Sequence, residues 1–168
     1  MEVFISEAEV DDAKIIIDYL KIISKESDNL SFGEDECNFN ELEEMSIIQE
    51  YLNDDRSIML LGFIEDELVS IGSLSTPSKK RYHHRSELGI SVRKDYWHMG
   101  VASAMMEELI EFSLEKKIEV IELQVRSDNT NAIKLYQKYG FEKIGTYPKY
   151  MKINNINYDA LLMNRYLK

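Results

Sequence analysis

Residues 87–109 read ELGISVRKDYWHMGVASAMMEEL, a pattern that predicts a strand, a short polar loop and the start of an amphipathic helix. Three small residues, Gly100, Ala102 and Ser103, stand where the loop becomes the helix, and their size lets a ligand come close to the backbone. The first amides of a helix have no partner within it, and the helix dipole adds positive partial charge there. The stretch therefore predicts a site for a phosphate or diphosphate, although small residues at a helix start are more often ordinary packing.

This stretch matches neither of the two common nucleotide-binding loops. No Gly-Lys-Ser or Gly-Lys-Thr sequence follows the glycine, which excludes a Walker loop. The three-glycine pattern of dinucleotide-binding sites is also missing from the sequence.

A second informative stretch, residues 120–141, reads VIELQVRSDNTNAIKLYQKYGF. It predicts a strand over residues 120–126, a polar turn at Ser127, Asp128 and Asn129, and a short helix over residues 131–139. Gly140 is expected just after the end of this helix, where a left-handed residue is common.

The rest of the chain predicts alternating strands and helices. The other expected strands are residues 3–6, 57–64, 68–76, 86–92, 141–153 and 156–167, with a tight turn at Asn154-Asn155. The other expected helices begin after Asp11 and Asp12 as N-caps, at Asn40 with Glu43 as a capping box, and near residue 100. This order predicts one mixed α/β (α+β) domain over residues 1–168.

Composition limits the class of protein. The 168 residues carry a net charge of −11, which argues against nucleic-acid binding and is compatible with a cationic small molecule. No apolar run reaches the roughly 18–20 residues of a membrane helix, and no secretory leader is recognised. The lone Cys37 leaves neither a disulfide framework nor a cysteine zinc site and fits a reducing cytoplasm.

Taken together, the two stretches resemble the Gcn5-related N-acetyltransferase (GNAT) superfamily. Its diphosphate loop, Gln/Arg-x-x-Gly-x-Gly/Ala, is similar to Trp97-His98-Met99-Gly100-Val101-Ala102. Its downstream motif, Asn-x-x-Ala-x-x-x-Tyr-x-x-x-Gly-Phe, matches residues 129–141. The resemblance extends over nearly the whole chain and is closest to single-domain bacterial members that acetylate amino acids, antibiotics or other small amines.

The resemblance implies a fold and a co-substrate. We expect a central, mostly antiparallel sheet of about 6–7 strands, flanked by about 4 helices, with splayed parallel central strands. Acetyl-CoA is expected as the donor, with direct transfer to an amine in a ternary complex and no metal. The expected contacts to the coenzyme are Ile90, Val92, His98, Met99, Gly100, Val101, Ala102, Ser103, Asn129, Ala132 and Tyr136.

The loop departs from the family pattern, because Trp97 and Met99 stand where charged or amide side chains are usual. Phosphate binding is then expected to depend on backbone amides, which need no particular side chain. Five basic residues around the two stretches are candidates to offset the charge of coenzyme A, although each is more readily explained as solvated: Arg93, Lys94, Arg126, Lys134 and Lys138.

The resemblance also implies catalytic residues. Tyr136 is expected to be the general acid that protonates the leaving thiolate, with packing on the short helix as the alternative. Glu87 is the candidate general base, and a water chain is the alternative, because strand alternation places Glu87 on the opposite face from Ile90. Acceptor binding is expected in residues 27–36, with Phe32 as an apolar surface and Glu34 pairing with an ammonium group.

Several alternatives stay open at this point. The acceptor could be the N-terminus or a lysine of a protein, and the chain could be a non-catalytic acyl-CoA sensor or an acidic interaction domain. Relatives often pair through their terminal strands, so a homodimer is a further open alternative.

Overall fold

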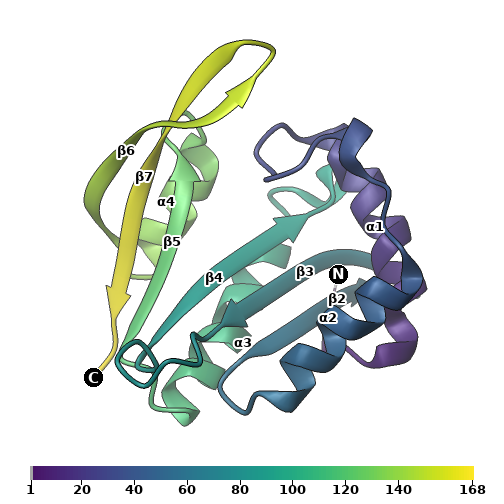
Figure 1. Ribbon diagram of the computed structural model, residues 1–168, viewed down its shortest axis with the longest axis horizontal. Helices are drawn as coiled ribbons and strands as arrows, with labels where there is room; N and C mark the ends of the chain where they lie inside the picture. Colours follow the sequence, from purple (N-terminus) through teal and green to yellow (C-terminus); the bar gives the residue numbers. More distant parts are fainter. Residues whose placement is uncertain (1) are drawn as a thin grey trace.

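The computed structural model describes residues 2–168, which form one seven-stranded sheet with helices on both faces (Figure 1). The strands are β1 (Phe4–Glu7), β2 (Ile58–Ile64), β3 (Glu67–Ser75), β4 (Arg85–Val92), β5 (Val120–Arg126), β6 (Glu142–Ile153) and β7 (Ile156–Tyr166). They lie in the order β1-β2-β3-β4-β5-β7-β6, and β4 and β5 are parallel while the other neighbours are antiparallel. The prediction of a mixed, mostly antiparallel sheet is confirmed.

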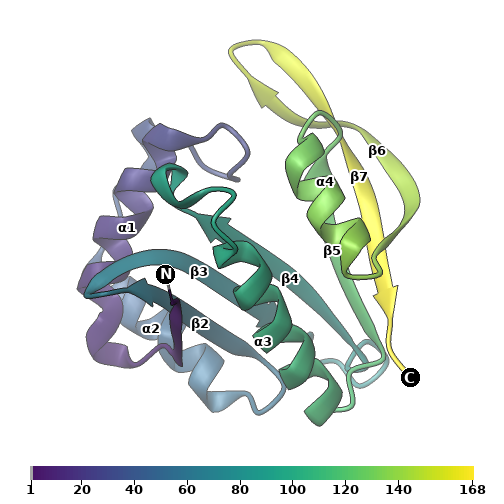
Figure 2. The ribbon, with the colours of Figure 1, turned by 180° about the vertical axis from the view of Figure 1, so that it is seen from behind.

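Four α-helices within residues 2–168 flank this sheet: α1 (Ala13–Glu26), α2 (Glu41–Asn53), α3 (Val101–Glu115) and α4 (Thr130–Lys138). Helices α1 and α2 lie on one face, and α3 and α4 lie on the other (Figures 1 and 2). Short 3₁₀ turns cover Val10–Asp12, Glu34–Glu36 and Lys94–Tyr96.

Strand alternation divides the core into two layers. On the α3 side, Leu74 and Leu88 pack with Met105 of α3, and on the α1 side Leu61 packs with Tyr19. Each face of the sheet therefore buries its own apolar set against its own helices.

The Met105 side chain of α3 packs directly over Gly72 of β3. A Cβ atom built at Gly72 would lie 2.5 Å from both Cγ and Sδ of Met105. The absence of a side chain at this position leaves the space that the Met105 side chain fills.

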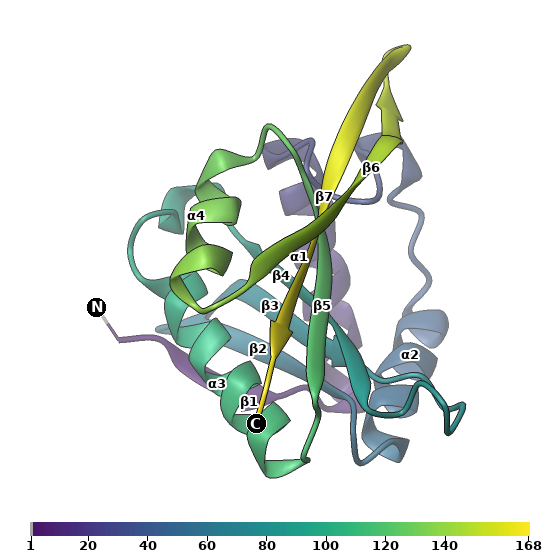
Figure 3. The ribbon, with the colours of Figure 1, turned by 90° about the vertical axis from the view of Figure 1, so that its left-hand side faces the viewer.

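The β6–β7 hairpin extends past the other strands at one end of the molecule (Figure 3). Its turn is formed by Asn154 (φ 49°) and Asn155 (φ 62°), both left-handed as a two-residue hairpin turn requires. This confirms the turn expected from the Asn-Asn sequence.

One of the predicted helix caps differs from the structure and another agrees with it. Asp12 precedes α1, but its carboxylate accepts the Glu9 amide at 2.8 Å instead of an amide of the helix, because residues 10–12 first form a 3₁₀ turn. Asn40 does cap α2, through a bond from the Leu42 amide at 2.8 Å to Asn40 Oδ1. None of the helices within residues 2–168 combines the length and apolar character that crossing a membrane requires.

Candidate active site

The parallel strands β4 and β5 stay paired only near their starts. Their register covers Arg85↔Val120, Ser86↔Ile121 and Glu87↔Glu122, and beyond it the strands separate toward their carboxyl ends (Figure 1). We call the two separated segments, residues 88–92 and 123–126, the V. The predicted splay of the central strands is confirmed.

The V leaves backbone groups of β4 without a strand partner. The Arg93 amide donates to the Val69 carbonyl at 2.9 Å, so alternate residues of β4 bond to β3, and Ile90 and Val92 direct their backbone groups toward β5. The Trp97 indole N–H donates to the Val92 carbonyl at 2.8 Å and occupies that acceptor. The N–H and C=O of Ile90 and the N–H of Val92 are therefore available to an extended ligand.

The loop after β4 brings amides together at the start of α3. His98 (φ 61°) and Gly100 (φ 85°) are both left-handed, and no side chain caps the helix at Gly100. Within residues 2–168, the structure gives the amides of residues 101–103 no hydrogen-bond partner. This arrangement of free amides at a helix start favours a bound anion.

The side chains of this loop contribute less than its backbone. Val101 is buried and packs with Ile64 and Val69, so only its amide can reach a ligand. His98 and Met99 are exposed, and the space around a Cβ built at Gly100 is open to 4 Å. Gly100 is therefore required by its left-handed backbone and not by crowding.

Ion pairs hold the loop against the rest of the protein. Arg93 pairs with Glu67 of β3 and, at 3.5 Å, with Glu26 at the end of α1. Tyr96 donates its hydroxyl proton to Glu67 at 2.6 Å, and this bond raises the pKa of the phenol. The loop is thus fixed before any ligand binds.

Two of the five basic residues expected to offset coenzyme charge have acidic partners of their own. Arg93 is paired as described, and Arg126 is paired with Asp128 at 2.7 Å, which holds the pKa of that carboxyl below its usual range. Lys94, Lys134 and Lys138 are exposed. The positive charge that these five residues can offer to a coenzyme is therefore reduced.

Asn129 begins α4 and caps it. Its Oδ1 accepts the Ala132 amide at 3.4 Å, which leaves its amide NH₂ group free to donate. A capping role accounts for an asparagine here, and the predicted contacts of Asn129 and Ala132 with a coenzyme stay predictions.

Tyr136 lies on the inner face of α4, one helical turn after Ala132. Its side chain is 9% exposed and its ring lies 5.7 Å from that of Phe141, within the core on the α3 side. Burial raises the pKa of the phenol to about 12, and within residues 2–168 the hydroxyl has no hydrogen-bond partner. The ring is buried, but the hydroxyl oxygen is not among the fully buried polar atoms of residues 2–168 that lack a partner. A protonated hydroxyl at the end of a buried ring fits either an acid that can reach a ligand or a packed aromatic residue.

Glu87 is exposed, at the last paired position of β4 before the V. Its neighbour Leu88 packs toward α3, so Glu87 projects toward the face that α1 and α2 cover. On β5, Glu122 stands opposite Glu87 but pairs with Arg85. Glu87 is consequently the carboxylate at this position that is not committed to an ion pair.

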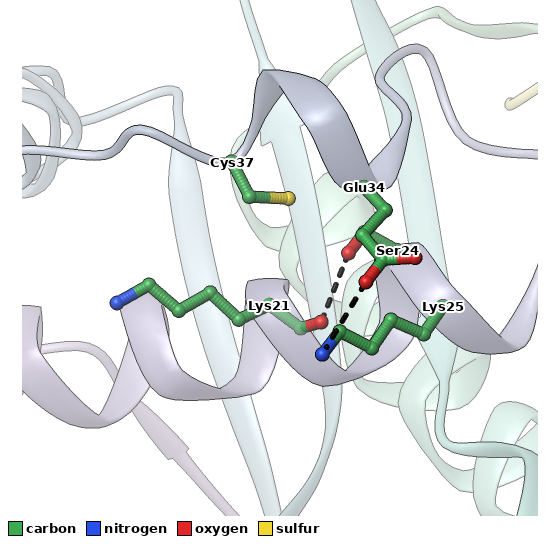
Figure 4. Close-up of a pocket in the computed structure, with 5 residues that line it drawn as sticks. All are labelled: Lys21, Ser24, Lys25, Glu34 and Cys37. Carbon is green, nitrogen blue, oxygen red and sulfur yellow. Dashed lines mark hydrogen bonds and ion pairs between the residues drawn. The ribbon is translucent and has the colours of Figure 1, made fainter.

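The two predicted acceptor-binding residues do not share a site. Phe32 packs edge-on against Phe39 at 5.5 Å, in the core under α1 and α2. Glu34 pairs with Lys25 at 3.4 Å, in a pocket that residues of α1 line together with Glu34 and Cys37 (Figure 4). The Lys25–Glu34 pair is a solvent-exposed one, with side chains 62% and 65% exposed, and the expected contact of Glu34 with an ammonium group stays a prediction.

Three contacts near the V were missed from the sequence. Arg126 donates to the Asp28 carbonyl at 3.1 Å, the Tyr19 hydroxyl bonds the Ser91 hydroxyl at 2.9 Å, and Trp97 bonds Val92. The first two join residues 98 and 72 positions apart, so no local pattern could have indicated them.

Within residues 2–168, no group of three or more His, Cys, Asp or Glu side chains could hold a metal ion.

Sequence comparisons agree with this geometry. A model of the acetyltransferase (GNAT) family matches residues 22–141. An L-amino acid N-acetyltransferase of Escherichia coli is 39% identical over 119 residues, which cover 70% of this chain and 74% of the relative. A ribosomal protein bS18 alanine N-acetyltransferase of E. coli is 31% identical over 74 residues, 44% of this chain and 50% of the relative.

Solved structures share the fold over the whole chain. An acetyltransferase of the GNAT family from Streptococcus pneumoniae superimposes with a TM-score of 0.95 at 30% identity, covering 99% of this chain and 100% of that one. A phosphinothricin acetyltransferase of Sinorhizobium meliloti, solved in complex with acetyl-CoA, has a TM-score of 0.87 at 15% identity, covering 99% of this chain and 89% of that one. At that identity the likeness concerns the fold alone.

Proposed function

Since the chain belongs to the acetyltransferase (GNAT) family, we propose that it transfers the acetyl group of acetyl-CoA to a small primary amine, with free amino acids as the first candidates. The observation that carries the proposal is the V, whose free β4 backbone leads directly to the uncapped amides of α3. The similarity to an L-amino acid N-acetyltransferase is the reason for placing amino acids first among the candidate acceptors. We propose that residues 1–168 act as one catalytic domain in the cytoplasm, which fits the free thiol of Cys37.

The residues at the V fit an acyl carrier with an amide-containing arm and a diphosphate. The N–H and C=O of Ile90 and the N–H of Val92 can bond an extended arm as a neighbouring strand would. Residues 98–103 offer backbone amides to a diphosphate beyond the tip of β4. The free NH₂ group of Asn129 can donate from the α4 side.

Acetyl-CoA, when bound, supplies the acyl group as a reactive thioester. The protein's part is to polarise the carbonyl, accept a proton from the amine and donate one to the thiol. A backbone amide of the V, that of Ile90 or Val92, is suited to polarise the carbonyl, because an unpaired amide is already aimed at the place where negative charge develops.

Tyr136 is suited to donate the proton. At neutral pH its hydroxyl carries the proton, because burial holds its pKa near 12, and within residues 2–168 no partner competes for that proton. Its ring is fixed against Phe141, so the hydroxyl needs little reorganisation to reach a ligand.

Glu87 is suited to accept the proton from the amine. An alkylammonium cannot attack a carbonyl until it loses a proton, and an unpaired carboxylate on the α1 side of the V can take it directly or through a water. Its negative charge also attracts a cationic amine toward that side.

The test is thiol release from acetyl-CoA in the presence of an amine panel. The panel contains the common amino acids, a polyamine, an aminoglycoside and a peptide with an N-terminal alanine, and product masses identify the molecule that gained an acetyl group. We expect turnover with one or more amino acids and background release without an amine. Turnover with the peptide alone would move the acceptor class to protein N-termini, and coenzyme A binding without turnover on any amine would indicate a sensor.

A further inference from the structure

The segment that follows α1 lies across the separated ends of β4 and β5. Figures 1 and 2 both show the chain after α1 reaching from the end of β4 toward β5 and α4. Residues 26–28 make the contacts, and we call them the strap. Its two ends touch the tips of the two arms of the V.

The first end of the strap is held to the tip of β4. Glu26 accepts the Lys94 amide at 2.8 Å and lies 3.5 Å from the Arg93 guanidinium, directly after Val92. Arg93 is only 15% exposed in its side chain, so this contact is partly shielded from water. The end of α1 is thereby fixed to the loop that precedes α3.

The second end of the strap is held to the tip of β5. Nη1 of Arg126 donates to the Asp28 carbonyl at 3.1 Å, although the two residues are 98 positions apart. Arg126 is the last residue of β5, so the bond ties the strap to the second arm of the V.

The Arg126 guanidinium is fixed before it meets the strap. Its Nε and Nη2 donate to the two carboxylate oxygens of Asp128 at 3.0 and 2.7 Å, and its Cζ atom lies 3.8 Å from the centre of the Tyr158 ring of β7. The side chain is 9% exposed. The bidentate pair and the cation–π contact leave Nη1 to reach Asp28, a geometry that a lysine ammonium cannot reproduce.

We propose that Arg126 is a positioning residue: through Asp28 it fastens the strap across the V and so holds residues 27–39, on the face that also carries Glu87, as a wall of the acceptor site. The inference rests on the proposed function and adds a specificity role that no catalytic group supplies. The coenzyme contacts proposed above lie on β4, α3 and α4, and the Arg126 side chain bonds to none of those residues, whereas residues 27–39 lose their tie to β5 when Arg126 is changed. Arg126→Lys also keeps the positive charge that could offset that of the coenzyme. The expected signature is a change in the KM for the amine without an equal change in the KM for acetyl-CoA.

The primary variant is Arg126→Lys, and Arg85→Lys is its matched control. Arg85 is likewise a strand arginine paired with a carboxylate, that of Glu122, and it lies 5.9 Å from the Tyr82 ring, but it has no contact with the strap. We expect Arg126→Lys to raise the KM for the amine about tenfold, equivalent to about 1.4 kcal/mol. The KM for acetyl-CoA and kcat should change less than about threefold, and Arg85→Lys should leave all three constants near those of the unmodified protein.

A second readout does not depend on turnover. Hydrogen exchange of the amides of residues 27–36 should become faster in Arg126→Lys and stay unchanged in Arg85→Lys. This measurement tests the strap even if no amine in the panel is acetylated, so failure of the inference and failure of the proposed function are separable.

Asp128→Ala provides a test that leaves Arg126 in place. The Asp128 side chain is 54% exposed and bonds the Arg126 guanidinium. Its removal should therefore speed the hydrogen exchange of residues 27–36 and raise the KM for the amine, each by less than Arg126→Lys does. This variant also tests the role of the strap if Arg126→Lys fails to fold. Unchanged exchange of residues 27–36 in both variants, or equal rises in the KM values of the amine and acetyl-CoA, would overturn the inference.

Discussion

Glu87 and Tyr136 lie on opposite faces of the sheet, on either side of the V. Glu87 projects from β4 toward the face of α1 and α2, whereas Tyr136 packs from α4 into the core on the α3 side. A proton acceptor and a proton donor so separated cannot neutralise one another directly. Under the proposed function, the amine gives up its proton on one face while the thiol receives one from the other.

Replacing Tyr136 by Phe removes the hydroxyl and keeps the ring against Phe141. We expect kcat to fall about 100-fold, in the range of a lost general acid, while coenzyme A affinity changes little. Trp97 is the single tryptophan of the chain and is 39% exposed at the loop, so its emission can report coenzyme binding in a titration. A variant with unaltered kcat would remove Tyr136 from the mechanism.

The pH dependence follows from the same residue. Because burial raises the pKa of Tyr136 to about 12, the phenol keeps its proton as the pH rises through the range where amines lose theirs. We expect kcat/KM for the amine to rise with pH and to show no fall below about pH 10. A fall near pH 8 would assign the acid to a different group.

Glu87→Gln removes the unpaired carboxylate without changing its size. We expect kcat/KM at pH 7 to fall at least about tenfold and to recover partly at higher pH, where more amine is deprotonated without help. Glu111→Gln, an exposed position on α3, is the control for loss of one negative charge. Equal activity of the two variants would favour a water chain in place of Glu87.

Gly100→Glu places bulk and negative charge among the free amides at the start of α3. We expect it to abolish coenzyme A binding, measured by Trp97 emission, and Gly100→Ala to keep some binding because the surrounding space is open. Either change costs about 1 kcal/mol of stability, since φ at this position is 85°. Gly145→Ala, at a strand position with ordinary contacts, is the control, and normal binding by Gly100→Glu would refute the diphosphate site.

Glu44 offers a stability test away from the V. It is 5% exposed on α2, and burial raises the pKa of its carboxyl. The folded state therefore holds this proton more tightly than the unfolded state, and stability decreases as the pH rises past the unfolded value of 4.5 toward the raised folded value.

Glu44→Gln should consequently raise the melting temperature at pH 7, by about 2–4 °C for each 1 kcal/mol relieved, and the gain should vanish below about pH 4. The exposed neighbour in Glu43→Gln should give no rise, because only a favourable charge near the helix start is lost. A gain at pH 7 of the same size in both variants would contradict the assignment to burial.

Local chemistry made much of the fold predictable. The alternating stretch of residues 120–126 coincides with β5, the Asn154-Asn155 turn has the left-handed angles expected, and Gly140 follows α4 with a φ of 83°. The start of α1 was less predictable, because the Asp12 carboxylate accepts the Glu9 amide instead of an amide of the helix. Which of the two amides it accepts depends on whether the preceding residues form a 3₁₀ turn.

The candidate site was predictable only where backbone groups form it. The amides of residues 98–103 and the free groups of Ile90 follow from strand, loop and helix order. The ion-pair partners of Glu34, Arg93 and Arg126 (Lys25, Glu67 and Asp128) could not be predicted, and the roles expected of these three residues stay predictions. Partners brought together by tertiary packing leave no trace in local sequence spacing.

The short register between β4 and β5 also bears on cooperativity of unfolding. Within residues 2–168, the strand register that joins the half-sheet β1–β4 to the half-sheet of β5, β7 and β6 covers three pairs, Arg85↔Val120, Ser86↔Ile121 and Glu87↔Glu122. The Glu119 and Val120 amides add bonds to the His84 carbonyl just before them. Side chains in the core on the α3 side, Met106 and Leu123 among them, must then supply most of the attachment between the halves. The carboxyl-terminal half is therefore the part of this chain most able to detach as a unit while the amino-terminal half keeps its structure.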